Sequence, residues 1–233
     1  MNEKPAPNNA PRSRGMLITL EGGEGAGKST QISHLSQNLR KAGIEVVATR
    51  EPGGSEGAEI LRNVLLSGVV KPLGPVAEAI LFAAARTDHI DKTIEPALAA
   101  GKWVISDRFA DSTRAYQGGL GQIDPRFLRA LERVTLGDLR PDLTLILDLP
   151  VEEGLLRAAR RRKPGEAIDR FESENLQFHQ TLRAAFLAIA ASDAERCAVI
   201  DASRGEAEVA EALWEVISRR LLDSQALDLA HGG

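Results

Sequence analysis

The chain has 233 residues, of which 43% are hydrophobic and 27% are charged, and its formal net charge is −4. The length fits one α/β domain, the hydrophobic content excludes a disordered protein, and the acidic balance argues against a protein whose main task is to bind a nucleic acid polymer. No apolar run approaches the roughly 18 residues of a membrane span, and the single cysteine, Cys197, cannot form an internal disulfide, so we expect a cytoplasmic protein without a membrane partner.

Strand and helix patterns alternate along the chain between two aperiodic ends, residues 1–15 and 223–233, which we expect to be flexible tails. Apolar runs predict strands at 16–20, 44–49, 102–106, 143–148 and 197–201. Helical periodicity predicts helices at 28–41, 57–66, 75–100 and 206–222. Apolar strands separated by helices predict an α/β fold, with a five-stranded parallel sheet covered by helices on both faces in one domain from 16 to 222.

The first strand runs directly into a glycine-rich turn. Residues 22–29 read GGEGAGKS, which fits the P-loop pattern G-x-x-x-x-G-K-S/T between a strand and a helix. The glycines let backbone N–H groups point at phosphate oxygens, and the helix that follows adds the positive end of its dipole. We expect Lys28 to reach the β- and γ-phosphates of ATP and Ser29 to ligate Mg²⁺. The predicted ATP-binding residues are Gly22, Gly23, Glu24, Gly25, Ala26, Gly27, Lys28, Ser29 and Thr30.

An acid and an arginine, Asp107 and Arg108, follow the third strand. The carboxylate can hold Mg²⁺ through water, and the planar guanidinium can clamp a substrate phosphate. No guanine-reading N-K-x-D segment follows the strand at 143–148, and no Asp-Glu pair ends the third strand, which argues against a GTPase switch and a remote ATPase. The pattern favours a small-molecule kinase, with Lys28 and Arg108 among its catalytic cations.

Four further segments make this pattern specific: TREPGG at 49–54, LFAAAR at 81–86, DRF at 107–109 and AYQGG at 115–119. In this order, from about residue 16 to residue 222, they resemble bacterial thymidylate kinases, which are P-loop nucleoside monophosphate kinases. The resemblance implies the three-layer P-loop kinase fold and transfer of the γ-phosphoryl group of ATP to thymidine 5′-monophosphate (dTMP), giving dTDP for dTTP synthesis, with Mg²⁺ as cofactor. It also implies a homodimer, in which the alanine-rich helix at 78–86 is a candidate for the packing surface.

The resemblance also assigns the acceptor side of the site. It implies that Phe82 stacks on thymine, that Arg86 hydrogen-bonds the O4 atom of the base, and that Tyr116 packs below the sugar and leaves no space for a 2′-hydroxyl. It implies that Arg108 binds the acceptor phosphate with help from Arg50. The full set of predicted acceptor-binding residues is Glu24, Arg50, Glu51, Phe82, Arg86, Arg108, Ser112, Thr113, Tyr116 and Gln117.

A basic run at 157–163 follows the fourth strand, where P-loop kinases carry a lid, and we expect the lid at about 157–172. The P-loop contains Glu24 and no arginine, so the resemblance is to the type of thymidylate kinase in which the lid supplies the catalytic arginine. Arg161 is the first candidate, followed by Arg157 and Arg160. Arg170 either touches phosphate or pairs with a neighbouring acid.

The predicted acceptor is a phosphate monoester that is already ionised, so the reaction needs alignment and charge neutralisation but no general base. The nearest alternative is a deoxynucleoside kinase acting on a free 5′-hydroxyl, for which Glu51 could serve as the base. A nucleotide-binding regulatory module without turnover and a degenerate homologue are further alternatives, although the intact Lys28–Ser29 and Asp107–Arg108 pairs argue against the last.

Overall fold

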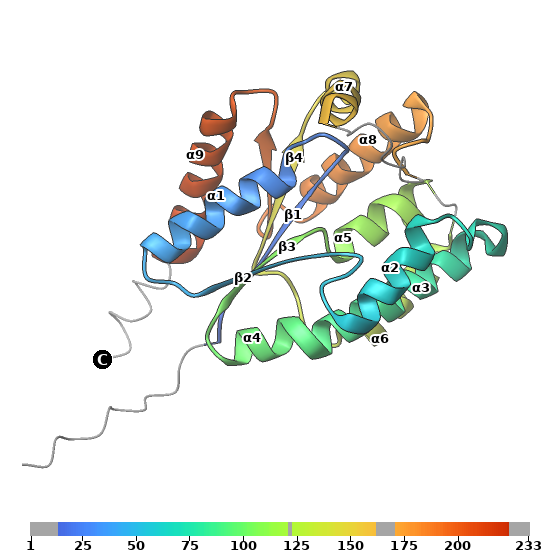
Figure 1. Ribbon diagram of the computed structural model, residues 1–233, viewed down its shortest axis with the longest axis horizontal. Helices are drawn as coiled ribbons and strands as arrows, with labels where there is room; N and C mark the ends of the chain where they lie inside the picture. Colours follow the sequence, from blue (N-terminus) through green and yellow to red (C-terminus); the bar gives the residue numbers. More distant parts are fainter. Residues whose placement is uncertain (1–13, 121–122, 162–170, 224–233) are drawn as a thin grey trace, which may run out of the picture.

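The computed structural model describes residues 14–120, 123–161 and 171–223 (Figure 1). Most of the two predicted tails, residues 1–13 and 224–233, lies outside the described residues. Residues 162–170 of the predicted lid, with Arg170, lie outside them as well.

The core of the fold is a five-stranded sheet in which every neighbouring pair of strands is parallel. The strands are β1 (Leu17–Gly22), β2 (Val46–Arg50), β3 (Trp103–Asp107), β4 (Leu143–Asp148) and β5 (Cys197–Asp201), in the order β2-β3-β1-β4-β5. The central strand, β1, is buried along its whole length, as expected for a parallel strand covered on both faces, and its buried residues include the polar Thr19 and Glu21. The predicted parallel sheet is confirmed.

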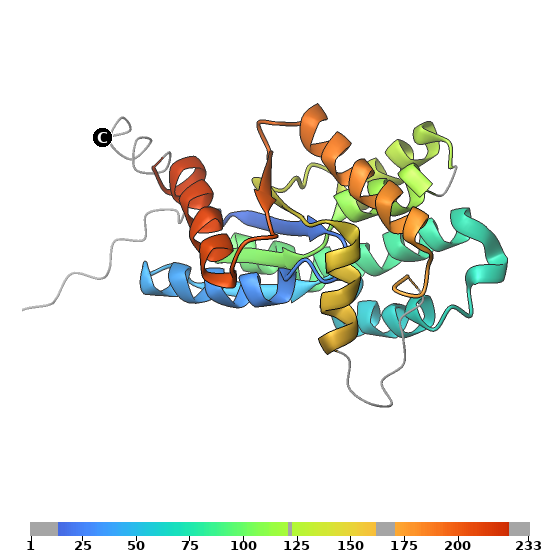
Figure 2. The ribbon, with the colours of Figure 1, turned by 90° about the horizontal axis from the view of Figure 1, so that it is seen from above.

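Helices cover both faces of this sheet, so the molecule has three layers (Figure 2). On one face, α1 (Lys28–Lys41) and α9 (Glu206–Ile217) pack side by side on the strands. Ile32, Leu35 and Leu39 recur on one side of α1 and are all buried in this layer of the core. The other face is covered by α8 (Leu176–Ser192) and by the helical segment that ends at α4 (Glu95–Ala99).

The remaining helical elements connect the strands and surround the carboxyl end of the sheet. They are α2 (Glu56–Leu66), the 3-10 helix η1 (Lys71–Leu73), α3 (Gly74–His89), α5 (Ala110–Thr113), α6 (Pro125–Leu136), α7 (Val151–Arg161), and the π-helical turns η2 (Ile90–Ile94), η3 (Arg114–Leu120) and η4 (Ser218–Leu222). The helix predicted at 75–100 is thus α3, η2 and α4 in unbroken succession. No single helix among the described residues is long and apolar enough to cross a membrane, and one sharply bent pair, 56–66 with 71–99, passes that test by length and composition alone.

Candidate active site

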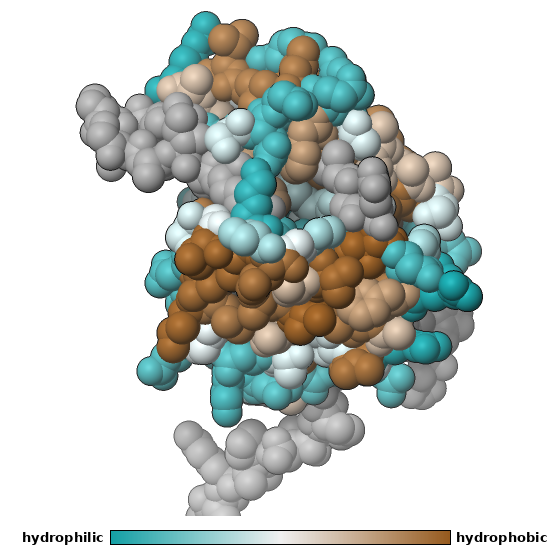
Figure 3. Space-filling model, turned by 90° about the vertical axis from the view of Figure 1, so that its right-hand side faces the viewer, coloured by the Kyte–Doolittle hydropathy of each residue, from teal (hydrophilic) through white to brown (hydrophobic). Residues whose placement is uncertain are grey.

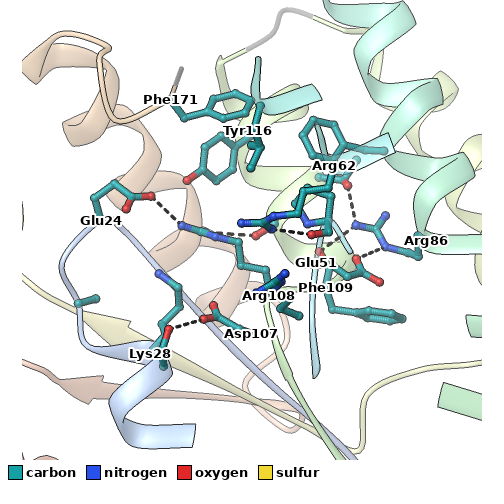
Figure 4. A pocket seen from close by; sticks show the side chains of 18 of the residues that line it. Glu24, Lys28, Glu51, Arg62, Arg86, Asp107, Arg108, Phe109, Tyr116 and Phe171 are labelled. Atoms are coloured by element: carbon teal, nitrogen blue, oxygen red, sulfur yellow. Dashed lines mark hydrogen bonds and ion pairs between the residues drawn. The ribbon is translucent and has the colours of Figure 1, made fainter. Parts of the chain in front are cut away.

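A pocket of about 290 Å³ opens where β1, β2 and β3 end (Figure 4). Parallel strands bring their carboxyl ends to the same edge of a sheet, so segments far apart in sequence meet there. The pocket brings together most of the predicted site residues: Glu24, Gly25, Ala26, Gly27, Lys28, Ser29, Arg50, Glu51, Phe82, Arg86, Asp107, Arg108, Ser112, Thr113, Tyr116, Gln117 and Arg161. Gly22 and Gly23 line a small neighbouring cavity behind the P-loop, and Thr30 lines neither.

The P-loop curls around the side chain of Lys28. Its Nζ donates hydrogen bonds to the backbone carbonyls of Gly22 and Gly23, at 3.2 and 2.9 Å. Gly25 and Gly27 adopt left-handed φ angles of 68° and 88°, which a glycine reaches without the steric cost of a side chain. Burial, with the nearby positive charge of Arg108, lowers the pKa of Lys28 below its ordinary value, so an anion beside the ammonium group would favour its charged form.

A hydroxyl and a carboxylate lie side by side next to this loop. Ser29 Oγ donates a hydrogen bond to Asp107 Oδ2 at 3.0 Å, which joins the first turn of α1 to the end of β3. Mg²⁺ usually takes only one or two protein oxygens and fills its other positions with water and substrate phosphates. The described residues contain no cluster of three or more His, Cys, Asp or Glu side chains suited to a metal. The Ser29–Asp107 pair therefore fits an ion that is shared with nucleotide phosphates.

Arg108 occupies the centre of the pocket with an unusual backbone. Its φ of 72° is left-handed, a region that non-glycine residues rarely adopt unless the surroundings hold them there. Nη1 donates to the carbonyl of Gly22 at 3.1 Å, Nη2 donates to Glu24 Oε1 at 3.1 Å, and the guanidinium lies 5.3 Å from the ring centroid of Tyr116. These contacts hold the cation over the space between the P-loop and the rest of the pocket.

Glu24 and Arg108 each favour the charged form of the other. Burial by itself raises the pKa of Glu24, but Arg108 and Lys28 outweigh it and hold that pKa below its ordinary value. Arg161 contributes in the same direction. Burial likewise works against the charge of Arg108, whose pKa is nevertheless raised by Tyr116 and Glu24. Glu24 is therefore an ionised carboxylate that orients Arg108 at neutral pH.

A buried network fixes the side chain of Arg86. Its Nε donates to Glu51 Oε2 at 2.7 Å, and its Nη2 donates to Thr113 Oγ1 at 3.0 Å and to the carbonyl of Phe109 at 3.1 Å. The other oxygen of Glu51 lies 3.0 Å from His89 Nδ1. Both carboxylate oxygens of Glu51 are thus engaged. The sequence did not indicate this role for His89, which has no motif spacing and is fully buried.

Two arginines lie at the outer side of the pocket. Arg50 forms an ion pair with Glu59, 3.1 Å from each carboxylate oxygen, and its side chain is 55% exposed. Arg62 donates from Nη1 to the carbonyl of Pro52 at 2.6 Å and also lines the pocket (Figure 4). Arg62 was not predicted from the sequence, because an arginine on an amphipathic helix has no signal that separates it from an ordinary surface charge.

Aromatic side chains close the pocket opposite Lys28. Tyr116 meets Phe171 edge-to-face with ring centroids 5.2 Å apart, and Phe82 lies 6.2 Å from Phe171 in a tilted arrangement. Phe82 and Tyr116 come from predicted motifs, whereas Phe171 lies within the range expected for the lid, 157–172, and was not predicted as a site residue. The three rings form one apolar surface on which a flat base could stack.

The three candidate lid arginines differ in whether they line the pocket. Arg161, the last residue of α7, lines the pocket, whereas Arg157 donates to the carbonyl of Ala202 at 3.0 Å and to Glu153 Oε1 at 2.6 Å. Arg160 is exposed on α7 and does not line the pocket. Only the first of the three is placed to meet a ligand in this arrangement.

A buried acid, Glu21, holds two of the residues that line the pocket, Phe109 and Ser112. It accepts hydrogen bonds from the backbone N–H of Phe109 at 2.8 Å and from Ser112 Oγ at 2.6 Å. Burial, with the nearby charge of Asp111, raises its pKa to about 7. Glu21 was not predicted, because it lies between the apolar run at 16–20 and the P-loop motif at 22–29.

Comparisons with known proteins identify the family of the chain. The model of the thymidylate kinase family matches residues 20–213. The chain is 58% identical to a thymidylate kinase of Bradyrhizobium diazoefficiens over 213 residues, which is 91% of this chain and 93% of that protein. It is 54% identical to one of Rhodopseudomonas palustris over 229 residues, 98% of this chain and 99% of that protein. The crystal structure of thymidylate kinase from Ehrlichia chaffeensis superposes with a TM-score of 0.69 at 33% identity, covering 88% of this chain and 99% of that one.

Proposed function

Because the chain belongs to the thymidylate kinase family and transfers the γ-phosphoryl group of ATP to dTMP, giving ADP and dTDP, we propose that both nucleotides meet in the pocket at the ends of β1, β2 and β3. The observation that carries the proposal is the convergence of Lys28, Arg108 and Arg161 on this one pocket. Phosphoryl transfer spreads negative charge over the moving group, so several cations fixed around one point supply what the transition state requires.

The donor side of the pocket is the P-loop, residues 22–30. The N–H groups of its backbone and the start of α1 face the phosphates of ATP, and Lys28 reaches between the β- and γ-phosphates. Ser29 and Asp107, the latter through water, would hold Mg²⁺, which when bound neutralises charge on the phosphates of ATP. The 3.0 Å hydrogen bond between these two side chains supports this assignment.

The acceptor side is the remainder of the pocket. Phe82 stacks on thymine, Arg86 donates to its O4, and Gln117 with Ser112 or Thr113 reads its N3 edge. The network around Glu51 supports this role for Arg86, because a guanidinium locked at two of its nitrogens presents the rest of its fork in a fixed direction.

The sugar and phosphate of dTMP lie between these two sides. Tyr116 packs below the sugar, where its ring leaves no room for a 2′-hydroxyl. Arg108 clamps the acceptor phosphate, Arg50 supports it, and Glu24 orients Arg108 through the 3.1 Å ion pair.

The reaction proceeds without a general base. The acceptor oxygen of dTMP belongs to an ionised phosphate, so it attacks the γ-phosphorus directly once it is aligned. The deoxynucleoside kinase alternative would require Glu51 as the base, and both of its oxygens are already bonded, to Arg86 and His89. The side chains of the pocket therefore align the two nucleotides and neutralise the charge of their phosphates. Arg161 completes the site by contacting the transferred phosphoryl group.

The functional unit is a homodimer in the cytoplasm. An exposed apolar patch supports the dimer: Ile60, Val69, Leu73, Val76, Ile80 and Val134 are 45–86% exposed. They belong to α2, α3, α6 and the turn around η1, and Figure 3 shows a continuous hydrophobic area on that side of the molecule. Monomeric proteins rarely expose such a patch. The cytoplasmic location rests on the family and on a single, buried cysteine.

A coupled ADP-release assay tests the function. ATP with Mg²⁺ is offered with dTMP, thymidine, deoxyuridine monophosphate and the other nucleoside monophosphates in parallel, and Lys28→Ala measures the background rate. We expect dTMP to give the highest kcat/KM and thymidine to give only background. Faster turnover with thymidine than with dTMP would contradict the proposal and point to a deoxynucleoside kinase.

A further inference from the structure

Helix α7 meets the P-loop backbone to backbone, at two glycines. A Cβ atom added to Gly154, in the first turns of α7, would overlap the carbonyl oxygen of Glu24. A Cβ atom added to Gly25 would overlap the carbonyl oxygen of Gly154. Both overlaps are with backbone atoms, so they cannot be relieved by turning a side chain. Any other residue at 154 forces α7 and the P-loop apart.

Local helix stability does not account for Gly154. A glycine inside a helix is destabilising by about 1 kcal/mol relative to alanine, and α7 has only 11 residues. Gly154 is nonetheless a regular helical residue, whose N–H bonds to the carbonyl of Pro150 at 3.0 Å. Its conformation requires no glycine, so the close approach to Glu24 is the feature that does.

The contact lies between two groups of the proposed site. Glu24, whose carbonyl faces Gly154, also holds Arg108 through its carboxylate at 3.1 Å. Arg161 lies on α7 two helical turns beyond Gly154, about 10 Å along the axis and on nearly the same face. The face of α7 that rests on the P-loop is therefore the face that presents Arg161 to the pocket, and Arg161 is close enough to lower the pKa of Glu24.

We propose that Gly154 is a positioning residue: its contact with the P-loop sets the height and tilt of α7, and thereby places Arg161 at the transferred phosphoryl group. The inference rests on the proposed role of Arg161 and adds the residue that fixes its position. Because α7 is a rigid rod over this distance, a methyl group at 154 shifts Arg161 relative to Lys28 and Arg108. Misplacement of a catalytic group by about 1 Å lowers the rate on the order of 10²-fold.

The test compares Gly154→Ala with Leu156→Ala, a matched control on α7 whose side chain is 58% exposed. We expect kcat of Gly154→Ala to fall on the order of 10²-fold with the KM for dTMP little changed. Its thermal midpoint should fall by no more than a few degrees, because the preference of alanine for a helix offsets part of the cost of separating α7 from the P-loop. The control should keep wild-type kcat. A Gly154→Ala variant with wild-type kcat would overturn the proposal.

The double variant separates this inference from the role of Arg161. If Gly154 acts through Arg161, then Gly154→Ala in the Arg161→Ala background should change kcat less than about 3-fold, since coupled residues are not additive. An equal loss in both backgrounds would overturn the inference and leave the proposed function intact. Full activity of Arg161→Ala alone would instead overturn the proposed role of Arg161.

A measurement without a variant at 154 keeps the proposal testable if Gly154→Ala fails to fold. Amide hydrogen exchange is followed across residues 151–158 of the Arg161→Ala protein, with and without ATP. Because the P-loop rests on Gly154, ATP binding should slow exchange in this segment even without the arginine side chain. Unchanged exchange would mean that the two elements move independently, and the proposal would be wrong.

Discussion

Five arginine side chains line the pocket, and they differ in burial and in the groups that they contact. Arg86 is buried against Glu51, Arg108 is held by Glu24, and Arg50 forms an exposed pair with Glu59. Arg161 reaches the pocket from the end of α7. Removing one partner of a buried ion pair strongly lowers the free energy of unfolding, whereas removing one partner of an exposed pair lowers it little. The same residue type is therefore expected to respond differently to mutation at each place.

Removal of the Arg161 side chain should lower kcat on the order of 10³-fold, as loss of an arginine finger does in other phosphoryl-transfer enzymes. The matched control is Arg160→Ala, which removes the same charge from the adjacent position outside the pocket and should keep kcat near the wild-type value. Both are measured by steady-state ADP release. Equal loss in the two variants would indicate a general charge effect of α7 and contradict a specific role for Arg161.

Substitution Glu51→Gln should weaken both stability and acceptor binding. It leaves Arg86 as a buried cation without its counter-charge, which costs about 3 kcal/mol of the free energy of unfolding. The KM for dTMP should rise while the KM for ATP stays unchanged, because Arg86 belongs to the proposed acceptor side. Urea unfolding and initial rates measure the two effects. Glu59→Gln, at the exposed pair with Arg50, is the control and should cost less than about 1 kcal/mol.

The titration of Glu21 should make the protein less stable as pH rises. Its folded-state pKa of about 7 lies above its ordinary value of 4.5, so the folded state binds more protons than the unfolded state between these values. The free energy of unfolding should fall across pH 4.5 to 7 by an amount on the order of 3 kcal/mol, and level off above. Urea unfolding at several pH values measures this. Glu21→Gln should remove that part of the dependence, and an unchanged slope would refute the assignment.

At the scale of elements, α2 depends on a side chain from another helix. Its N-cap residue, Ser55, makes no capping bond of its own to the helix backbone. Instead, Asp88 of α3 accepts from Ser55 Oγ at 2.6 Å and from the N–H of Ala58 at 3.1 Å. These bonds, the one from Ser55 foremost, lower the pKa of Asp88. The helix that carries Arg62 is thus fixed to the helix that carries Arg86.

We expect Asp88→Ala to lower the thermal midpoint by a few degrees, because the first N–H groups of α2 lose their acceptor. Amide exchange at residues 56–60 should become faster, as α2 frays from its start. Asp91→Ala removes an exposed carboxylate from the following turn and serves as the control. If both variants unfold at the same temperature and exchange alike, Asp88 does not cap α2.

At the scale of the whole molecule, an exposed apolar patch extends over α2, α3 and α6 on the face drawn in Figure 3. A glutamate in the middle of this patch should place an unpaired charge in the proposed dimer interface. We therefore expect Ile80→Glu to sediment as a monomer at concentrations where the wild type is a dimer. Val199→Glu is the matched control, because Val199 is 47% exposed, as Ile80 is, but lies on β5, outside the patch. A dimeric Ile80→Glu variant, or a monomeric Val199→Glu variant, would contradict this interface.

The parallel sheet, the positions of its five strands along the chain and the phosphate-binding loop could all be predicted from the amino-acid sequence. These are local signals: a mostly apolar run such as residues 143–148 predicts a buried strand, and the glycine spacing of the P-loop is fixed by its own backbone. The motifs that resemble thymidylate kinases are similarly short and contiguous. The helices and strands that were predicted with bounds end within about two residues of those in the structure, because propensity and periodicity act over a short range, whereas α5 to α8 were not predicted with bounds.

The pairing of side chains across the site, like the order of the strands in the sheet, could not be predicted from the sequence. Glu21, Arg62, His89 and Asp88 have no sequence signal, because their roles depend on partners that distant elements bring near. The same holds for Gly154, which reads as a helix weakness in sequence and as a backbone contact in space. Burial and charge pairing arise only when the chain packs, so no local sequence pattern encodes them. In this site, burial and charge pairing determine which cation is rigid, which acid is ionised and which arginine reaches the pocket.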